Sequence, residues 1–186
     1  MKAIGPNAAL VLIDLQTAVD DPRLGRRNNP AAEENVSRLL AHWRKTRRPI
    51  VHIRYVSREP NSPFKGEGLE FKPVAVPLEH ELVLTKPGKN AFIGTTLESW
   101  LGDKQITQLV ILGVSTNNSV EATARMSGEL GFDTIVVSDA TFAFDRLDYD
   151  GRPRTAEEVH AMSLANLEGE YARIHSTSAL LGAAGA

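Results

Sequence analysis

Three side chains with reactive groups stand at or just after the ends of apolar runs in this sequence: Asp14, Lys86 and Ser119. A carboxylate can move a proton, an ammonium group can stabilise a nearby anion, and a hydroxyl can attack a carbonyl carbon. If the apolar runs are parallel strands, their carboxyl ends lie at one edge of a sheet and bring these groups together. The sequence therefore predicts an acyl-transfer site built from the three residues.

Several apolar segments are typical of β-strands. Segment 8–14 is apolar until its final Asp14, and continuous runs of this length favour strands that are buried on both faces. Further strands are predicted at 50–55, 82–85, 109–114 and 134–138, with a short one near 173–176. A long polar loop, 56–80, follows the second strand, and loops of this length in compact domains are often functional.

Helices are predicted between these strands. Asn29, followed by Pro30, is expected to cap the first helix. Others begin at Thr95 or Thr96 and near Ser119, and Gly131 ends the latter. Residues 155–158, Thr-Ala-Glu-Glu, form a capping box that opens the last long helix.

The alternation of strands and helices predicts an α/β fold, organised as a single domain over residues 1–186. We expect a three-layer, doubly wound sheet of about six strands, mostly or all parallel, with helices on both faces. Ligands bind such sheets beyond the carboxyl ends of the strands, near a topological switch point. No glycine-rich phosphate loop follows the first strand, which argues against a nucleotide or dinucleotide enzyme.

The composition of the chain argues against some classes of binding partner. The formal net charge of the 186 residues is −2, and no dense Lys/Arg run suggests binding to nucleic acid or a membrane. Neither a membrane-spanning run nor a signal-peptide pattern is present, so we expect a cytoplasmic protein. The absence of cysteine excludes disulfides and thiolate metal sites.

Three motifs surround the reactive residues. Residues 12–16 read Leu-Ile-Asp-Leu-Gln, and residues 86–92 read Lys-Pro-Gly-Lys-Asn-Ala-Phe, followed by Gly94-Thr95-x-Leu97. The third runs from Gly113 through Val120 to Arg125. Together they resemble the cysteine hydrolases of the isochorismatase-like superfamily, in its amidohydrolase branch, over about residues 7–175. This resemblance implies a hydrolase that uses no cofactor.

The resemblance also implies a role for each residue. Asp14 would take the proton of the nucleophile and pass it to a leaving amine, while Lys86 would favour the anionic nucleophile. The backbone N–H groups of Ser115 and Ser119, at a helix start, would form an oxyanion hole. The family typically has a cis peptide just before this turn, here Val114–Ser115.

Position 119 departs from the family pattern, which places a cysteine immediately before Val120. A hydroxyl is far less acidic than a thiol, and an Asp–Lys pair offers no imidazole to deprotonate it. The favoured interpretation is an inactivated Cys-to-Ser variant, and the alternative is a naturally divergent family member.

No metal site is predicted. Nicotinamidases of the superfamily carry an Asp-x-His pattern after the second strand, and this chain has none there. The histidines are dispersed: His52 is expected in the core, while His42 and His160 are expected to be partly exposed on helices.

Candidate substrate-binding residues flank the predicted strand ends. Tyr55, Phe64, Phe142 and Phe144 could form an aromatic wall, and Asn118 could donate amide hydrogen bonds; core packing of Phe142 and capping by Asn117 are equally good explanations. Such a site would suit a small planar amide, ureide or imide. A substrate carboxylate could be bound by Lys89, Arg54 or Arg125, although Arg125 fits a structural role better.

Three functions remain open. The first is hydrolysis of a small C–N compound, such as an amide, ureide, carbamoyl compound or imide, through an acyl-enzyme. The second is cleavage of a vinyl ether, which family members perform with the Asp and Lys alone, and the third is non-catalytic ligand binding. Because relatives are usually oligomers, we also expect a homodimer or homotetramer, with loop 56–80 and segment 141–154 within reach of a neighbour.

Overall fold

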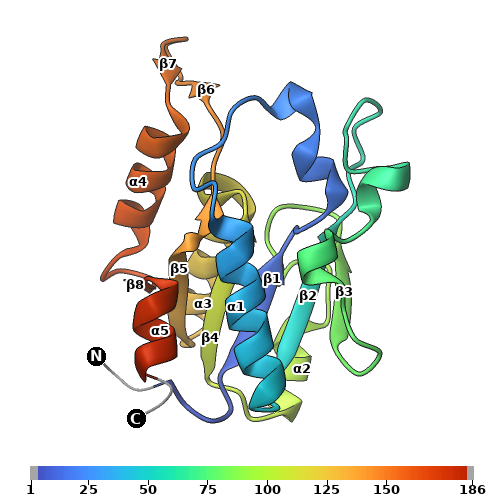
Figure 1. The fold of residues 1–186 in the computed structure, drawn as a ribbon, viewed down its shortest axis with the longest axis vertical. Helices are drawn as coiled ribbons and strands as arrows, with labels where there is room; N and C mark the ends of the chain where they lie inside the picture. Colours follow the sequence, from blue (N-terminus) through green and yellow to red (C-terminus); the bar gives the residue numbers. More distant parts are fainter. Residues whose placement is uncertain (1–3, 184–186) are drawn as a thin grey trace.

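One parallel sheet organises the molecule. The computed structural model describes residues 4–183, and its central sheet has six strands in the order β3-β2-β1-β4-β5-β8, with every neighbouring pair parallel (Figure 1). The strands are β1 (Ala9–Ile13), β2 (Ile50–Tyr55), β3 (Leu82–Lys86), β4 (Gln108–Val114), β5 (Asp133–Phe142) and β8 (Arg173–His175). The predicted α/β fold with a parallel sheet of about six strands is confirmed.

Helices cover both faces of this sheet. Alternate residues of the central strands face opposite sides and form two cores. One core lies under α1 (Ala32–Lys45) and α5 (Thr177–Ala183), and the other under α2 (Leu97–Asp103), α3 (Glu121–Glu129) and the end of α4 (Ala156–Leu167). None of the helices in residues 4–183 is long and apolar enough to cross a membrane.

The topological switch point lies between β1 and β4. From β1 the chain adds β2 and β3 on one side, and it then adds β4, β5 and β8 on the other. At this point Gly113 has φ of 119°, and a Cβ atom there would lie 2.1 Å from the Ile13 carbonyl oxygen. Only glycine therefore allows the two strands to approach so closely where their carboxyl ends meet.

Several local predictions differ from the structure. Asn29 does not cap α1, which begins at Ala32 after an uncapped Ala31; its side-chain amide donates instead to the Ser138 and Thr141 carbonyls, at 2.8 and 2.7 Å. The amide thus donates to two carbonyls of β5 and does not cap the helix.

Other elements were not predicted. A π-helical turn, Thr116–Val120, replaces the regular helix start that was expected near Ser119. A two-stranded hairpin, β6 (Arg146–Leu147) and β7 (Pro153–Arg154), and helix α5 lay outside the predicted set. The hairpin strands are only two residues long, so they carry almost no periodic pattern.

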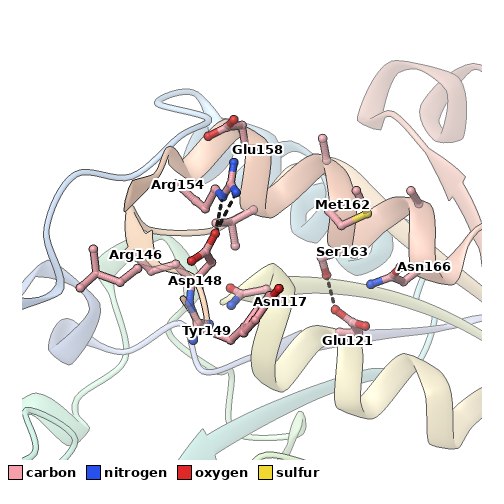
Figure 2. Close-up of a pocket in the computed structure, with 14 residues that line it drawn as sticks. Asn117, Glu121, Arg146, Asp148, Tyr149, Arg154, Glu158, Met162, Ser163 and Asn166 are labelled. Atoms are coloured by element: carbon pink, nitrogen blue, oxygen red, sulfur yellow. Dashed lines mark hydrogen bonds and ion pairs between the residues drawn. The ribbon is translucent and has the colours of Figure 1, made fainter. Parts of the chain in front are cut away.

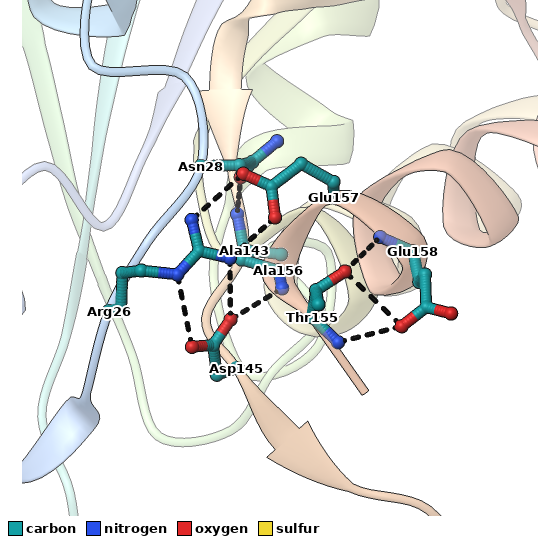
Figure 3. A network of polar contacts seen from close by, with 8 residues as sticks. All are labelled: Arg26, Asn28, Ala143, Asp145, Thr155, Ala156, Glu157 and Glu158. Atoms are coloured by element: carbon teal, nitrogen blue, oxygen red, sulfur yellow. Dashed lines mark hydrogen bonds and ion pairs between the residues drawn. The ribbon is translucent and has the colours of Figure 1, made fainter. Parts of the chain in front are cut away.

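The predicted capping box of α4 is present (Figure 3). The Thr155 hydroxyl accepts from the Glu158 N–H at 3.2 Å, and the Glu158 carboxylate accepts from the Thr155 N–H at 2.8 Å. Asp145 accepts from the Ala156 N–H at 2.7 Å and from Arg26, which also pairs with Glu157. The start of α4 is therefore tied to two distant segments of the chain.

Replacing Thr155 with alanine is expected to lower the free energy of unfolding by about 1 kcal/mol, because one N–H at the helix start loses its acceptor. Thr155→Ser keeps the hydroxyl and should lose much less. Urea unfolding of both variants measures the difference. An equal loss for alanine and serine would show that the hydroxyl does not cap α4.

Candidate active site

Lys86 joins the three predicted residues. Its Nζ donates to Asp14 Oδ2 at 2.8 Å, to Ser119 Oγ at 3.1 Å and to the Gly88 carbonyl oxygen at 3.0 Å. An ammonium group has three hydrogens, so each one has an acceptor. The structure therefore brings the carboxylate, the ammonium group and the hydroxyl into direct contact at the carboxyl edge of the sheet.

The backbone around Asp14 is shaped by the switch point. Its φ of 51° lies in the left-handed region, which Asp and Asn adopt more readily than most residues, and its N–H donates to the Ile53 carbonyl at 3.0 Å. Just beyond it, the side chain of Gln16 donates to the Tyr55 carbonyl and accepts from the Tyr55 N–H, at 3.0 and 2.8 Å. Gln16 thus fixes the end of β2 beside Asp14.

Ser119 lies in the π-helical turn between β4 and α3. The carbonyl of Ser115 accepts from the N–H groups of Asn118 and Val120, at 3.0 and 3.3 Å. The N–H groups of Ser115 and Ser119, the expected oxyanion-hole donors, are not among these. The peptide bond between Val114 and Ser115 is cis, as the family resemblance implies.

Burial dominates the electrostatics of the site. Asp14, Lys86 and Ser119 are 2%, 0% and 3% exposed. Burial raises the pKa of Asp14 and lowers the pKa of Lys86, and the attraction between the two groups opposes both shifts. Asp14 Oδ1 is buried and has no hydrogen-bond partner among the described residues, so this oxygen is free to accept a proton.

The turn that carries Ser119 is packed against α4 through a buried histidine. His160 Nδ1 lies 2.8 Å from Thr116 Oγ1, and Ser163 Oγ lies 3.0 Å from the Thr116 carbonyl oxygen. His160 is only 9% exposed, so its predicted partial exposure is wrong; burial lowers its pKa and favours the neutral ring. Helix α4 thus packs against the turn that carries Ser119.

Two of the candidate substrate-binding residues lie next to the three-residue site. Tyr55 is paired with Lys86 across β2 and β3, and its ring lies 5.2 Å from the ring of Phe64. Both rings line a cavity of about 480 Å³, together with Lys89. The Tyr55 ring is also 4.8 Å from Lys86 Nζ, so the same ring borders both this cavity and the buried ammonium group.

The other candidates do not line this cavity. Phe142 is fully buried, with the Arg27 guanidinium 4.1 Å above its ring and the Phe144 ring 5.8 Å away. Asn118 is exposed on the π-helical turn. Tyr55 with Phe64 and Phe142 with Phe144 therefore form two aromatic pairs, and Phe64 and Phe144 pack against the core cluster that contains Phe142.

A larger groove lies beside the turn that carries Ser119 (Figure 2). It has a volume of about 1090 Å³, and its walls come from α4, the β6–β7 hairpin and the start of α3. Asn117, Glu121 and Tyr149 line it, whereas Asp14, Lys86 and Ser119 do not. Ser163 also lines the groove, and its hydroxyl donates to Glu121 at 2.6 Å and lies 3.0 Å from the Thr116 carbonyl oxygen.

Among residues 4–183, no group of three or more His, Cys, Asp and Glu side chains is placed to hold a metal ion. His52, which was expected in the core, is fully buried and lies 2.8 Å from Glu81, and Glu81 also pairs with Arg44. This cluster connects β2 to α1 and stands apart from Lys86.

Sequence reasoning missed two residues that shape the site. Gln16 is part of the 12–16 motif, and its place two residues after Asp14 was a usable signal. His160 gave no signal, because its partner Thr116 is distant in sequence and its helix has a weak amphipathic pattern.

Comparisons with known proteins agree with this geometry. The isochorismatase domain profile matches residues 8–179. The isochorismatase family protein YrdC of Bacillus subtilis is 42% identical over 175 residues, which cover 93% of this chain and 94% of YrdC. Ureidoacrylate amidohydrolase RutB of Cronobacter turicensis is 33% identical over 95 residues, which cover 51% of this chain and 38% of RutB.

A solved structure matches along the entire chain. It is a crystal structure of a hydrolase assigned to the isochorismatase family, from Chromobacterium violaceum, with a TM-score of 0.96 and 48% identity. The match covers 100% of this chain and 97% of the other. With the profile, the relatives and the fold in agreement, the chain belongs to the isochorismatase family of hydrolases.

Proposed function

We propose that the site hydrolyses a C–N bond of a small amide, ureide, carbamoyl or imide compound through a covalent acyl-enzyme, without a metal. The observation that carries this proposal is the contact of Lys86 Nζ with both Asp14 and the side chain of residue 119. A cation touching a nucleophile stabilises its anionic form, and the adjoining carboxylate supplies a place for its proton.

The reaction follows from these contacts. The side chain of residue 119 attacks the carbonyl carbon while its proton moves to Asp14 Oδ1, the oxygen that Lys86 does not occupy. The oxyanion is stabilised by the N–H groups of Ser115 and Ser119. The C–N bond then breaks, and Asp14 returns the proton to the leaving amine. Water next attacks the acyl group with Asp14 again as base, which frees the acid and residue 119.

Serine at position 119 is expected to impair this chemistry. The thiol has a reference pKa of about 8.5 and is readily ionised beside a cation, whereas an alcohol is not. Asp14 is buried next to Lys86 without an imidazole, so the base available here suits a thiol. We therefore treat the chain as an impaired Cys-to-Ser form, able to bind substrate because the exchange alters one atom.

A second candidate is cleavage of a vinyl ether, in which Asp14 acts alone as the proton donor. One observation favours it: burial raises the pKa of Asp14, and a higher pKa favours the protonated carboxyl that acid catalysis needs. This route does not require a nucleophile at position 119. The name of the relative ureidoacrylate amidohydrolase RutB, in contrast, supports the C–N bond.

The two functions are separated by assaying the purified chain on both substrate classes. If the amide proposal is right, the Ser119 chain hydrolyses neither isochorismate nor an amide panel at a useful rate, and Ser119→Cys releases ammonia or amine. Turnover of isochorismate by the Ser119 chain, lost in Asp14→Asn, would support the vinyl ether instead. Binding without turnover by both forms would leave only the ligand-binding function.

We also propose that the chain assembles as at least a homodimer. Leu147, Tyr149 and Met162 line the groove beside the turn that carries Ser119 and are 62%, 96% and 64% exposed (Figure 2). Clustered exposed apolar side chains of this size are typical of interaction surfaces. Light scattering at micromolar concentration should give at least twice the chain mass of 20.3 kDa.

The same surface offers a variant to test this prediction. Leu147→Asp combined with Tyr149→Asp is expected to shift the assembly toward the monomer, because each substitution would place a carboxylate in a contact from which water is excluded. Val83→Asp, on an exposed part of β3 remote from this groove, is the matched control. A mass near 20.3 kDa for the unaltered chain would refute the proposed assembly.

A further inference from the structure

We propose that Lys89 recognises a carboxylate on the substrate, so that the preferred substrates are small amides or ureides that carry a negative charge. This inference rests on the proposed function and narrows its substrate class. It concerns the cavity next to the three-residue site, which is lined by Tyr55, Phe64 and Lys89.

Lys89 lies close to the three-residue site. Lys89 Nζ lies 4.1 Å from the centre of the Tyr55 ring, and Lys86 Nζ lies 4.8 Å from the same ring. Because Lys86 also contacts Ser119 at 3.1 Å, a short series of direct contacts connects the nucleophile position to Lys89. A molecule of a few bonds could therefore place its carbonyl at residue 119 and an acidic group at Lys89.

The ammonium group of Lys89 has no acidic partner among the described residues. Within residues 4–183, Lys89 forms no ion pair, whereas Lys72 pairs with Asp20 and Glu33, and Lys86 pairs with Asp14. Glu59 is the acidic residue among those lining the cavity, and its side chain is exposed without an ion pair to Lys89. The ammonium of Lys89 thus rests on an aromatic face with its hydrogens available to a ligand.

The two other candidate cations are engaged elsewhere. Arg125 pairs with Glu121 at 2.7 Å and lies over the Tyr171 ring at 4.7 Å. Arg54 donates to the Thr85 hydroxyl at 3.3 Å. Of the three residues that could bind a carboxylate, only Lys89 lines the cavity of about 480 Å³ beside the site.

The charge of Lys89 also reaches the reacting groups. It lowers the pKa of both Asp14 and Lys86, against the raising effect of burial on Asp14. A bound carboxylate would offset this charge, so the pKa of both groups would rise when an anionic substrate binds. Binding would then help Asp14 to take up the proton of the nucleophile.

The remaining walls suit a small polar molecule. Ser57, Asn61 and Ser62 also line the cavity and carry hydroxyl and amide groups. Volumes of several hundred cubic ångströms are typical of small-ligand sites, with a few polar groups on largely apolar walls. The cavity therefore combines hydrogen-bonding groups and two aromatic rings with the ammonium of Lys89, which has no ion pair within residues 4–183.

The test uses matched probes, succinamate and succinamide, which share one amide and differ in charge at the other end; malonamate and glutaramate, each with its diamide, extend the panel to other lengths. In Ser119→Cys, the ratio of kcat/KM for the anion over the diamide should fall about tenfold or more in Lys89→Met, mainly through KM. Lys89→Arg should keep most of the preference. Lys65→Met, which removes an exposed lysine of the neighbouring loop, is the control and should keep the ratio.

Calorimetry measures the binding of the same probes to the Ser119 chain, and it therefore tests the role of Lys89 without requiring turnover. Binding of an anion that weakens in Lys89→Met, without any turnover by Ser119→Cys, would support Lys89 and contradict the proposed hydrolysis. Turnover of anionic and neutral probes with equal kcat/KM would support the hydrolysis and overturn the role of Lys89. If no anion of the panel is bound or hydrolysed, the inference is overturned as well.

Discussion

In a Ser119→Cys background, replacing Asp14 with asparagine is expected to lower amide hydrolysis by at least about 10³-fold. Asp14 Oδ1 is the unpartnered buried oxygen beside the nucleophile, and an amide in its place cannot take up the proton. Asparagine suits the left-handed φ of 51° at this position, so the variant should fold. The rate of ammonia or amine release measures the effect.

The pH dependence of the Ser119→Cys form offers a second readout of the same group. Because burial raises the pKa of Asp14 above its ordinary value of 3.8, activity should decline on the acid side at a pH higher than a solvent-exposed aspartate would give. Asp139→Asn, which alters an aspartate bonded to Thr177 rather than to Lys86, is the matched control. Equal activity of Asp14→Asn and its parent would exclude Asp14 as the base.

Lys86→Met is expected to lower the free energy of unfolding by about 3–5 kcal/mol at neutral pH, because it leaves a buried carboxylate without its partner. In this variant burial still raises the pKa of Asp14, and the opposing effect of Lys86 is removed while the weaker effects of Ser119 and Lys89 remain, so the pKa in the folded chain lies above the ordinary 3.8. The folded chain then binds a proton more tightly than the unfolded chain, and the loss should grow as pH rises above 3.8. Chemical unfolding across pH tests both statements.

The double variant Asp14→Asn with Lys86→Met removes both charges and should recover part of the lost stability, by about 1–3 kcal/mol. Lys72→Met is the matched control: its side chain is also buried, but its partner Asp20 is 59% exposed, so its loss should be smaller. If Lys86→Met and Lys72→Met lower the free energy of unfolding equally at every pH, the burial of the Asp14–Lys86 pair does not make its loss more costly than the loss of an exposed pair.

The contact of Asp14, Lys86 and Ser119 could be predicted because the three residues have equivalent positions relative to the predicted strands. Each residue ends or follows an apolar run, and the carboxyl ends of parallel strands share one edge. The strand bounds were close for the same reason, since buried parallel strands leave continuous apolar runs.

Other features depend on contacts between distant segments, and no local pattern encodes them. Asn29 has the residue type of a helix cap, but two strand carbonyls of β5 recruit its amide instead. The π-helical turn at Ser119 closes on Ser115, and His160 of α4 holds the same turn at Thr116. Local propensity predicted a helix there and could not predict how the turn is wound.

The aromatic candidates show why the lining of a cavity is harder to predict than the contact of Asp14, Lys86 and Ser119. Phe142 and Tyr55 have similar sequence contexts, each at the end of a strand. Phe142 is fully buried under Arg27, whereas Tyr55 lines the cavity with Lys89. Hydrophobic type alone does not distinguish a core ring from a cavity wall, because both are apolar positions near a strand end.

The central claim is that residue 119 is the nucleophile position of an Asp–Lys site that suits a thiol. The direct test compares turnover of the Ser119 chain and Ser119→Cys on one panel of small amides, ureides and carbamoyl compounds, with Ser99→Cys as a control that adds an exposed thiol elsewhere. We predict that Ser119→Cys is faster by at least about 10²-fold and that Ser99→Cys is not. Equal turnover by the Ser119 chain and Ser119→Cys would contradict the claim and favour the vinyl-ether reaction, in which Asp14 acts alone.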